Sequence, residues 1–301
     1  MSQFQNIAVV ARLRQAAVID SLRRLVTFLK ADGRTVFVEK VTAESLNDPS
    51  IETISRSSVE GTVDLVIVVG GDGSMLGAAR ALADLNVPLL GLNRGRLGFL
   101  TDIHPDDMEV SIGKVLAGEF HATDRLLLEM TVERGDKIIG SGLALNDFVL
   151  HPGRSVRMME LELYIDGQFV YSQRSDGLIV STPTGSTAYA LSAGGPIMTP
   201  ELNAMVLVPM NAHTLASRPI LVSAESQLEV LVGTRNELHP QVSCDGQADV
   251  TTEPGDVIKI RRKDRPVRLI HPLGHNFYET CRNKLGWGKR LDSLRSDIVS
   301  R

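Results

Sequence analysis

The chain has 301 residues, with 32 basic and 36 acidic side chains for a formal charge of −4, and only two cysteines. This length predicts two domains. Two scattered cysteines argue against a disulfide scaffold and against a structural zinc site. They also favour a reducing, cytoplasmic location. A slightly acidic chain with 4% aromatic residues is a poor match for a nucleic-acid-binding protein. No signal-peptide pattern and no long apolar stretch occur, so we expect a protein that is neither exported nor bound to a membrane.

The first part of the chain alternates between strand and helix patterns. Four short apolar runs lie at 6–10, 35–38, 64–69 and 87–91. Each run is followed by polar residues or glycine, as is typical of strands that are buried on both faces. Between the runs, apolar residues repeat at helical spacing. This alternation predicts an α/β N-terminal domain with a mostly parallel sheet and helices on its faces.

The second part of the chain has a different pattern. After about Leu126 apolar residues alternate with other residues, and Arg134-Gly135-Asp136 and Asp166-Gly167 are turns of the hairpin type. A mainly antiparallel β C-terminal domain is therefore predicted, followed by a C-terminal helix that returns to the first domain. The predicted segments are 1–120 for the α/β domain, 121–275 for the β-rich domain, and 276–301 for the helix and tail.

The segment Gly70-Gly71-Asp72-Gly73 stands where a buried strand pattern meets a helix pattern. Glycines there let backbone N–H groups approach phosphate oxygens, and a helix N-terminus attracts negative charge. The spacing is neither the dinucleotide fingerprint GxGxxG nor the ATPase motif GxxxxGK[ST], so both of those classes are disfavoured. Taken alone, the segment is also consistent with a tight turn in which Asp72 only caps the helix.

Two further segments favour a ligand site. A second glycine-rich turn, 91–100, follows the next strand, and loops after neighbouring parallel strands open at the same edge of a sheet, where ligands bind. The segment 182–187 is rich in hydroxyl groups and leads into a short helix. Tyr189 is a candidate for contact with an adenine, and the hydroxyl groups with Asp176 are candidates for a ribose. A hydroxyl-rich loop of this kind also occurs as a solvated turn or helix cap.

These motifs, together with Asn146-Asp147 and Gly194-Gly195-Pro196, occur in the order and spacing found in bacterial NAD kinases, which the chain resembles from Ile7 to Leu285. The run 182–189 carries most of the resemblance, because Gly-Gly-Asp-Gly also occurs in diacylglycerol kinases and 6-phosphofructokinases. The resemblance implies a phosphotransferase that uses ATP and a divalent metal ion, with Mg²⁺ expected, to phosphorylate the adenosine ribose 2′-hydroxyl of NAD. It also implies a homo-oligomer, either a dimer or a tetramer.

The same resemblance assigns roles to individual residues. It makes Asp72 the proton acceptor. The residues that it places against the substrate are Asp72, Gly73, Asn146, Asp147, Arg157, Arg174, Asp176, Thr187, Ala188, Tyr189, Ala190, Leu191, Ser192 and Gln247. The two arginines lie outside the dense motifs and are also consistent with surface ion pairs. No metal ligands are predicted.

Two alternatives remain open at this stage. One is a lipid or sugar kinase that shares Gly-Gly-Asp-Gly, and the other is a non-catalytic regulator that binds NAD. The scattered histidines, His275 among them, are interpreted as surface or structural residues, and Cys244 as a small core residue.

Overall fold

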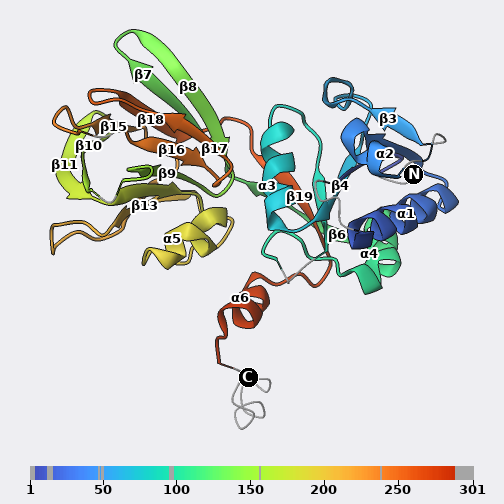
Figure 1. Cartoon of the computed structure of the whole chain (residues 1–301). Helices are drawn as coiled ribbons and strands as arrows, with labels where there is room; N and C mark the ends of the chain where they lie inside the picture. Colours follow the sequence, from blue (N-terminus) through green and yellow to red (C-terminus); the bar gives the residue numbers. More distant parts are fainter. Residues whose placement is uncertain are drawn as a thin grey trace, which may run out of the picture.

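The computed structural model describes residues 4–11, 16–46, 48, 51–94, 98–155, 157–237 and 239–288, and it contains the predicted α/β and β-rich parts (Figure 1). Gly95, Arg96 and Leu97 of the second glycine-rich turn and the tail after 288 lie outside the described residues. No helix in the described ranges is long and apolar enough to cross a membrane.

The first sheet has seven strands in the order β3-β2-β1-β4-β5-β19-β6. Its strands are β1 (Asn6–Ala11), β2 (Thr35–Glu39), β3 (Glu52–Ile54), β4 (Leu65–Gly70), β5 (Leu89–Asn93), β6 (Phe120–Arg125) and β19 (Val267–Pro272). All neighbouring strands are parallel except β6, which runs antiparallel to β19. Every residue of β4 and β5 is buried, as their unbroken apolar runs predict.

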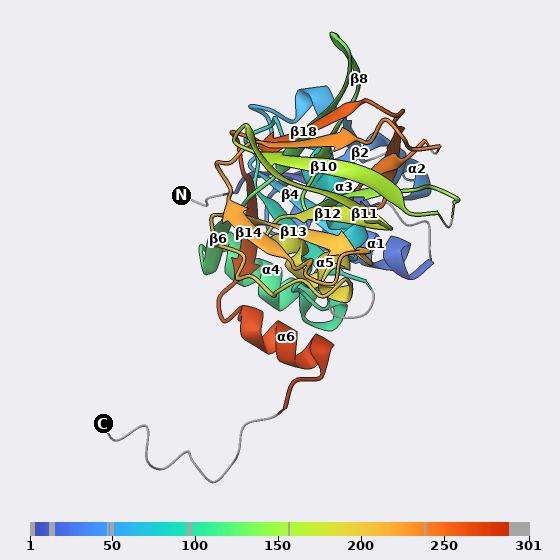
Figure 2. The ribbon, with the colours of Figure 1, turned by 90° about the vertical axis from the view of Figure 1, so that its left-hand side faces the viewer.

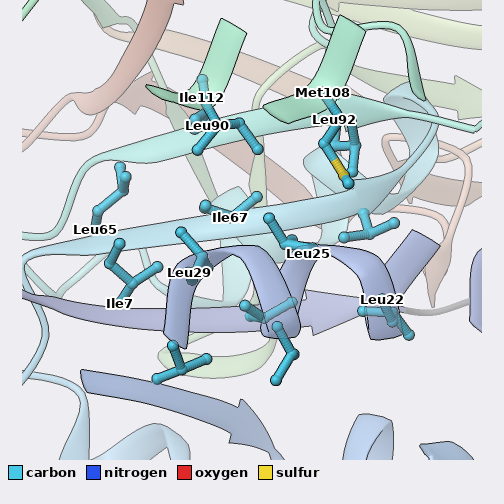
Figure 3. Packing of buried hydrophobic residues seen from close by; sticks show 14 of the residues in the cluster. Ile7, Leu22, Leu25, Leu29, Leu65, Ile67, Leu90, Leu92, Met108 and Ile112 are labelled. Atoms are coloured by element: carbon cyan, nitrogen blue, oxygen red, sulfur yellow. The ribbon is translucent and has the colours of Figure 1, made fainter. Parts of the chain in front are cut away.

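Helices cover both faces of this sheet, because alternate strand residues point to opposite faces. The helices of the first part are α1 (Ala16–Ala31), α2 (Lys40–Leu46), α3 (Asp72–Ala81) and α4 (Met108–Leu116), with the 3-10 turns η1 (Arg56–Ser58) and η2 (Pro105–Asp107). α1 and α4 pack on one face, where Leu25 and Ile112 meet Ile67 of β4 in one apolar cluster (Figure 3). α3 packs on the other face through Met75 against Val68.

The second part consists of two antiparallel six-stranded sheets, with orders β11-β10-β15-β18-β7-β8 and β14-β13-β12-β9-β16-β17. The strands of the first of these sheets are β7 (Leu128–Arg134), β8 (Lys137–Ala144), β10 (Met159–Ile165), β11 (Gln168–Ser175), β15 (Leu228–Val232) and β18 (Val257–Arg262). The strands of the other are β9 (Asp147–His151), β12 (Gly177–Ser181), β13 (Ala204–Met210), β14 (Ile220–Ser223), β16 (Gln241–Cys244) and β17 (Ala248–Thr251). The two sheets enclose one core, in which Leu128 and Phe148 take part.

The hairpin turns of this part lie where the sequence predicts them. Gly135 connects β7 to β8 with φ of 58°, and Asp166 and Gly167 connect β10 to β11 with φ of 52° and 75°. In the β10–β11 turn both central residues have positive φ, which is the geometry of a tight turn that suits twisted hairpins.

The first sheet draws strands from beyond residue 120. β6 and β19 belong to it, although nearly all of β6 and all of β19 fall within the segment 121–275. The chain therefore enters the β-rich part after β6 and comes back through β19. The proposed boundaries remain predictions.

The last helix, α6 (Phe277–Leu285), follows β19 and projects below the sheets (Figure 2). The Asn276 side chain accepts a hydrogen bond from Glu279 N at 3.1 Å and so caps its start. Gly286, with φ of 67°, ends it. The Phe277 ring lies 6.3 Å from the Phe99 ring, so this helix returns to the first part as predicted.

Candidate active site

Asp72 stands at the carboxyl edge of the first sheet, where β4 ends and α3 begins. The backbone is tightly packed at this point, since a Cβ atom on Gly70 would lie 2.3 Å from Ser74 Oγ. Glycine is therefore required before the helix, and the first N–H groups of α3 face the edge where parallel sheets bind anions.

The second glycine-rich turn holds the Asp72 carboxylate. Oδ2 accepts a hydrogen bond from Phe99 N at 2.8 Å, and Oδ1 accepts from Leu100 N at 3.1 Å and from Thr101 Oγ1 at 3.3 Å. A Cβ atom on Gly98 would lie 2.0 Å from Asp72 Oδ1, which explains the glycine there. The expectation that the two glycine-rich turns meet at one edge is confirmed. The carboxylate is fixed in direction yet keeps 30% of its side chain exposed.

Asn146 and Asp147, at the start of β9, are held by a carboxylate from a distant turn. Asp245 lies between β16 and β17 with φ of 49°. Its oxygens accept from Leu145 N at 3.2 Å, Asn146 N at 2.8 Å and Asp147 N at 3.2 Å. The Asn146 backbone is therefore positioned by the same turn that carries Gln247.

α3 is linked to that turn across the two parts of the molecule. Arg80 forms an ion pair with Asp245 and donates from Nη2 to Gln247 Oε1 at 2.6 Å. Gln247 in turn donates from Nε2 to Gly73 O at 3.2 Å. These contacts connect Gln247 and the Asn146 backbone to α3, the helix that begins with Asp72. Sequence analysis missed Arg80; its position two helical turns after Asp72, on the same helix face, was the available signal.

Burial raises the pKa of Asp147 to about 7, and the neighbouring charge of Asp245 adds to the effect. The folded protein therefore keeps this proton between about pH 4 and 7, whereas the unfolded chain has lost it. Because the folded state binds more protons in that window, the contribution of Asp147 to the unfolding free energy falls as the pH rises from about 4 to 7. Above about pH 7 this contribution no longer changes.

Asp147→Asn removes this titration. Relative to the wild type, the variant is expected to gain about 1–3 kcal/mol in unfolding free energy between pH 5 and pH 8. Urea unfolding of both proteins at the two pH values measures this. A difference between the proteins that is the same at both pH values would contradict the raised pKa.

Hydroxyl groups in and beside the hydroxyl-rich loop form hydrogen bonds with the backbone. The loop contains η3 (Thr184–Thr187) and leads into α5 (Tyr189–Ser192). Thr182 Oγ1 donates to Leu145 O at 2.5 Å, Ser181 Oγ donates to Asn146 O at 3.1 Å, and Ser186 Oγ donates to Pro183 O at 2.7 Å. These hydroxyl groups fix the backbone around Leu145, Asn146 and Pro183. The loop thereby positions Asn146, and its predicted role in binding the ribose stays a prediction.

A cavity of about 550 Å³ opens beside α5. Its lining includes His151, Asp176, Tyr189, Ser192 and Asn211. Tyr189 is 49% exposed, and Asp176 Oδ2 accepts from Asn211 Nδ2 at 2.9 Å. Predicted site residues from two separate segments therefore share one cavity wall.

The remaining predicted residues have varied surroundings. The Ala190 side chain is buried in an apolar cluster, so any contact it makes with a ligand is through its backbone. Thr187, Ala188 and Leu191 are half-buried on the same run.

The two arginines lie outside the lining of the cavity. Arg157 forms an exposed ion pair with Glu237, and Arg174 is exposed on β11. Their substrate roles stay predictions.

Among the described residues, one group of three side chains has ligand atoms close enough for a metal ion: Asp102, His271 and His275. Arg125 Nη2 and Thr123 Oγ1 each lie 3.1 Å from His271 Nε2. A guanidinium group only donates, so Nε2 accepts and Nδ1 carries the proton that His271 shares with Asp102. Both nitrogens of His271 are thereby used, and the group does not fit a metal ion.

The charge state of this group follows from its contacts. Burial lowers the pKa of His271, in keeping with a neutral ring. Burial opposes ionisation of Asp102, but hydrogen bonds from His271 and His275 outweigh it and hold the pKa of Asp102 well below its usual range. The cluster connects β19 and the segment before α6 to the loop that begins at Thr101.

The parallel sheet has an aspartate at a glycine-rich strand end and is linked through Arg80 to a β-rich domain. This arrangement is consistent with the class of two-domain nucleotide phosphotransferases. Residues 7–120 match the ATP-NAD kinase N-terminal domain and residues 145–272 match the ATP-NAD kinase C-terminal domain. The chain belongs to the NAD kinase family. A lipid or sugar kinase and a non-catalytic regulator are not favoured.

Relatives match the chain over nearly its whole length. The NAD kinase of Pseudomonas fluorescens strain Pf-5 is 57% identical over 291 residues, which cover 97% of this chain and 98% of that protein. The NAD kinase of Azotobacter vinelandii is 56% identical, and the match covers 97% of this chain and 99% of that protein.

Solved structures of two kinases are similar. A yeast NADH kinase complexed with NADH has the same fold, with a TM-score of 0.85 over 96% of this chain and 92% of that one at 24% identity. An NAD kinase from Archaeoglobus fulgidus in complex with ATP is 29% identical and has a TM-score of 0.70. The match covers 93% of this chain and 97% of that one.

Proposed function

We propose that the chain transfers the γ-phosphoryl group of ATP to the adenosine ribose 2′-hydroxyl of NAD, with Asp72 as the proton acceptor. The observation that carries this is the Asp72 carboxylate, which three donors from the second glycine-rich turn hold at the N-terminus of α3. The names of the relatives support the choice of substrates.

The chemistry suits this geometry. A bond forms between the 2′-oxygen and the γ-phosphorus while the bond from that phosphorus to the bridging oxygen breaks, and ADP leaves. The hydroxyl proton passes to an Asp72 oxygen. Because the transition state of phosphoryl transfer is loose, the direction in which a fixed carboxylate holds the hydroxyl matters more than its strength as a base. The N–H groups at the start of α3 supply donors for phosphate oxygens.

NAD would lie between the two parts of the molecule. Asn146 and Asp147 stand beside the Arg80–Asp245–Gln247 link, and Asp176 and Tyr189 line the cavity beyond them. We assign the ribose to the first pair and the adenine to the region of Tyr189, because carboxylates and amides suit sugar hydroxyls and an aromatic face suits a base.

A divalent ion, with Mg²⁺ proposed, would offset the charge of the triphosphate when bound. Asp72 Oδ1 accepts two hydrogen bonds and Oδ2 accepts one, so Oδ2 keeps acceptor capacity. The site therefore fits an ion that the phosphates and water would mainly hold, with Asp72 as a further oxygen partner. We also propose a homo-oligomer, either a dimer or a tetramer.

The test is a coupled assay. Purified protein is incubated with NAD and Mg-ATP, and an NADP-specific dehydrogenase reports the product. Formation of NADP at a rate that scales with protein concentration supports the proposal, and folded protein that yields no NADP above background would overturn it. NADH in place of NAD in the same assay decides which oxidation state is preferred.

A further inference from the structure

Lys284, in the last turn of α6, lies beside the proposed reaction centre. Its Nζ atom is 4.0 Å from Asp72 Oδ2 and 5.0 Å from the centre of the Phe99 ring. The residue falls after both matched family segments, which end at 120 and 272. A cation from the end of the chain thus reaches the start of α3.

The position of Lys284 is supported by its surroundings. Cys281, one turn earlier on α6, is fully buried, and Phe277 packs against Phe99. Phe99 donates its backbone N–H to Asp72 Oδ2 at 2.8 Å. The same residue therefore contacts Asp72 through its backbone and Lys284 through its ring, so the packing of α6 sets the distance between ammonium and carboxylate.

We propose that Lys284 binds the phosphates of the ATP donor and stabilises the negative charge of the γ-phosphoryl group during its transfer. The inference rests on the function proposed above. An ammonium group on a flexible stem is a compact point charge that pairs with phosphate oxygens. From 4.0 Å away from Asp72, Nζ can contact a phosphate held at the N-terminus of α3 while it still offsets the charge of the carboxylate.

A purely structural role makes different predictions. The Lys284 and Asp72 side chains are 29% and 30% exposed, and a pair at that exposure contributes little to stability. If Lys284 only attached α6, its loss would lower the melting temperature and would affect both substrates alike. A phosphate ligand would affect ATP and would leave the KM for NAD nearly unchanged.

The experiment compares Lys284→Met and Lys284→Arg with Arg282→Met as the matched control. Arg282 is a basic, exposed residue of the same helix. For each protein, initial rates are measured with Mg-ATP varied at saturating NAD and with NAD varied at saturating Mg-ATP. Binding of a non-hydrolysable ATP analogue is measured by calorimetry without NAD.

Lys284→Met is expected to lower kcat/KM for Mg-ATP by about 10-fold to 100-fold and to weaken binding of the analogue, because a charged hydrogen bond to phosphate is lost. Lys284→Arg should recover most of the loss, and Arg282→Met should behave as the wild type. The inference is overturned if Lys284→Met leaves both quantities unchanged, or if it raises the KM for NAD as much as the KM for Mg-ATP while binding of the analogue is unchanged. If the wild type forms no NADP, the proposed function fails, and binding of the analogue still tests Lys284.

Discussion

Asp72→Asn is expected to lower kcat by about 100-fold or more while the KM for NAD changes only by a few-fold. An amide of the same shape cannot take up the proton of the 2′-hydroxyl. Its remaining carbonyl oxygen can still accept from Leu100 N and Thr101 Oγ1, so the contact between the two loops is kept in part. Initial rates at varied NAD and Mg-ATP, together with the melting temperature, measure the effect.

Asp64→Asn is the matched control. Asp64 stands just before the other end of β4, where Oδ2 accepts from Gln5 N at 2.9 Å and from Asn6 N at 2.7 Å. It is an aspartate that accepts backbone hydrogen bonds but lies away from the site, so kcat should stay within about twofold of the wild type. If Asp72→Asn behaved like this control, Asp72 would be a cap or a binding residue only.

Arg80→Met is expected to lower the unfolding free energy by about 3 kcal/mol and to raise the KM for NAD by about tenfold or more. The Asp245 side chain is fully buried, and without Arg80 its charge loses its cationic partner. The same carboxylate positions the backbone of Asn146, so the loss reaches the proposed ribose site. Chemical unfolding and steady-state kinetics measure the two effects.

Arg268→Met provides the comparison for this second prediction. Arg268 pairs with Asp124 through two hydrogen bonds, but the side chains are 57% and 47% exposed. Arg268→Met should lower the unfolding free energy by less than about 1 kcal/mol and should leave the KM for NAD unchanged. If both variants lost the same unfolding free energy, the effect of the Arg80–Asp245 pair would not depend on its burial.

Much of the fold could be predicted because its signals are local. Strands buried on both faces, such as β4, are continuous apolar runs, and hairpin turns such as Asp166-Gly167 need residues that tolerate positive φ. The place of β19 in the first sheet could not be predicted, because it depends on pairing with β5 across more than a hundred residues. No local pattern encodes that choice.

The site was predictable to a smaller extent. The meeting of the two glycine-rich turns followed from the parallel sheet, and the cavity beside Tyr189 contains Asp176 as the composition of those segments indicated. A ribose-binding role for the hydroxyl groups of the 182–187 loop stays a prediction. Thr182 and Ser186 bind backbone carbonyl groups, and the sequence pattern does not distinguish such hydroxyl groups from those that bind a sugar. Arg80 and Lys284 were missed, since each acts on a residue far away in the chain.

The most direct test of the central claim is to identify the product by ³¹P NMR after the protein has been incubated with NAD and Mg-ATP, with Asp72→Asn run in parallel. The account predicts one new phosphomonoester on the 2′-oxygen of the adenosine ribose, formed in equal amount with ADP, and almost none with the variant. A phosphate on another hydroxyl, ADP formed with inorganic phosphate alone, or the same yield from Asp72→Asn would contradict it.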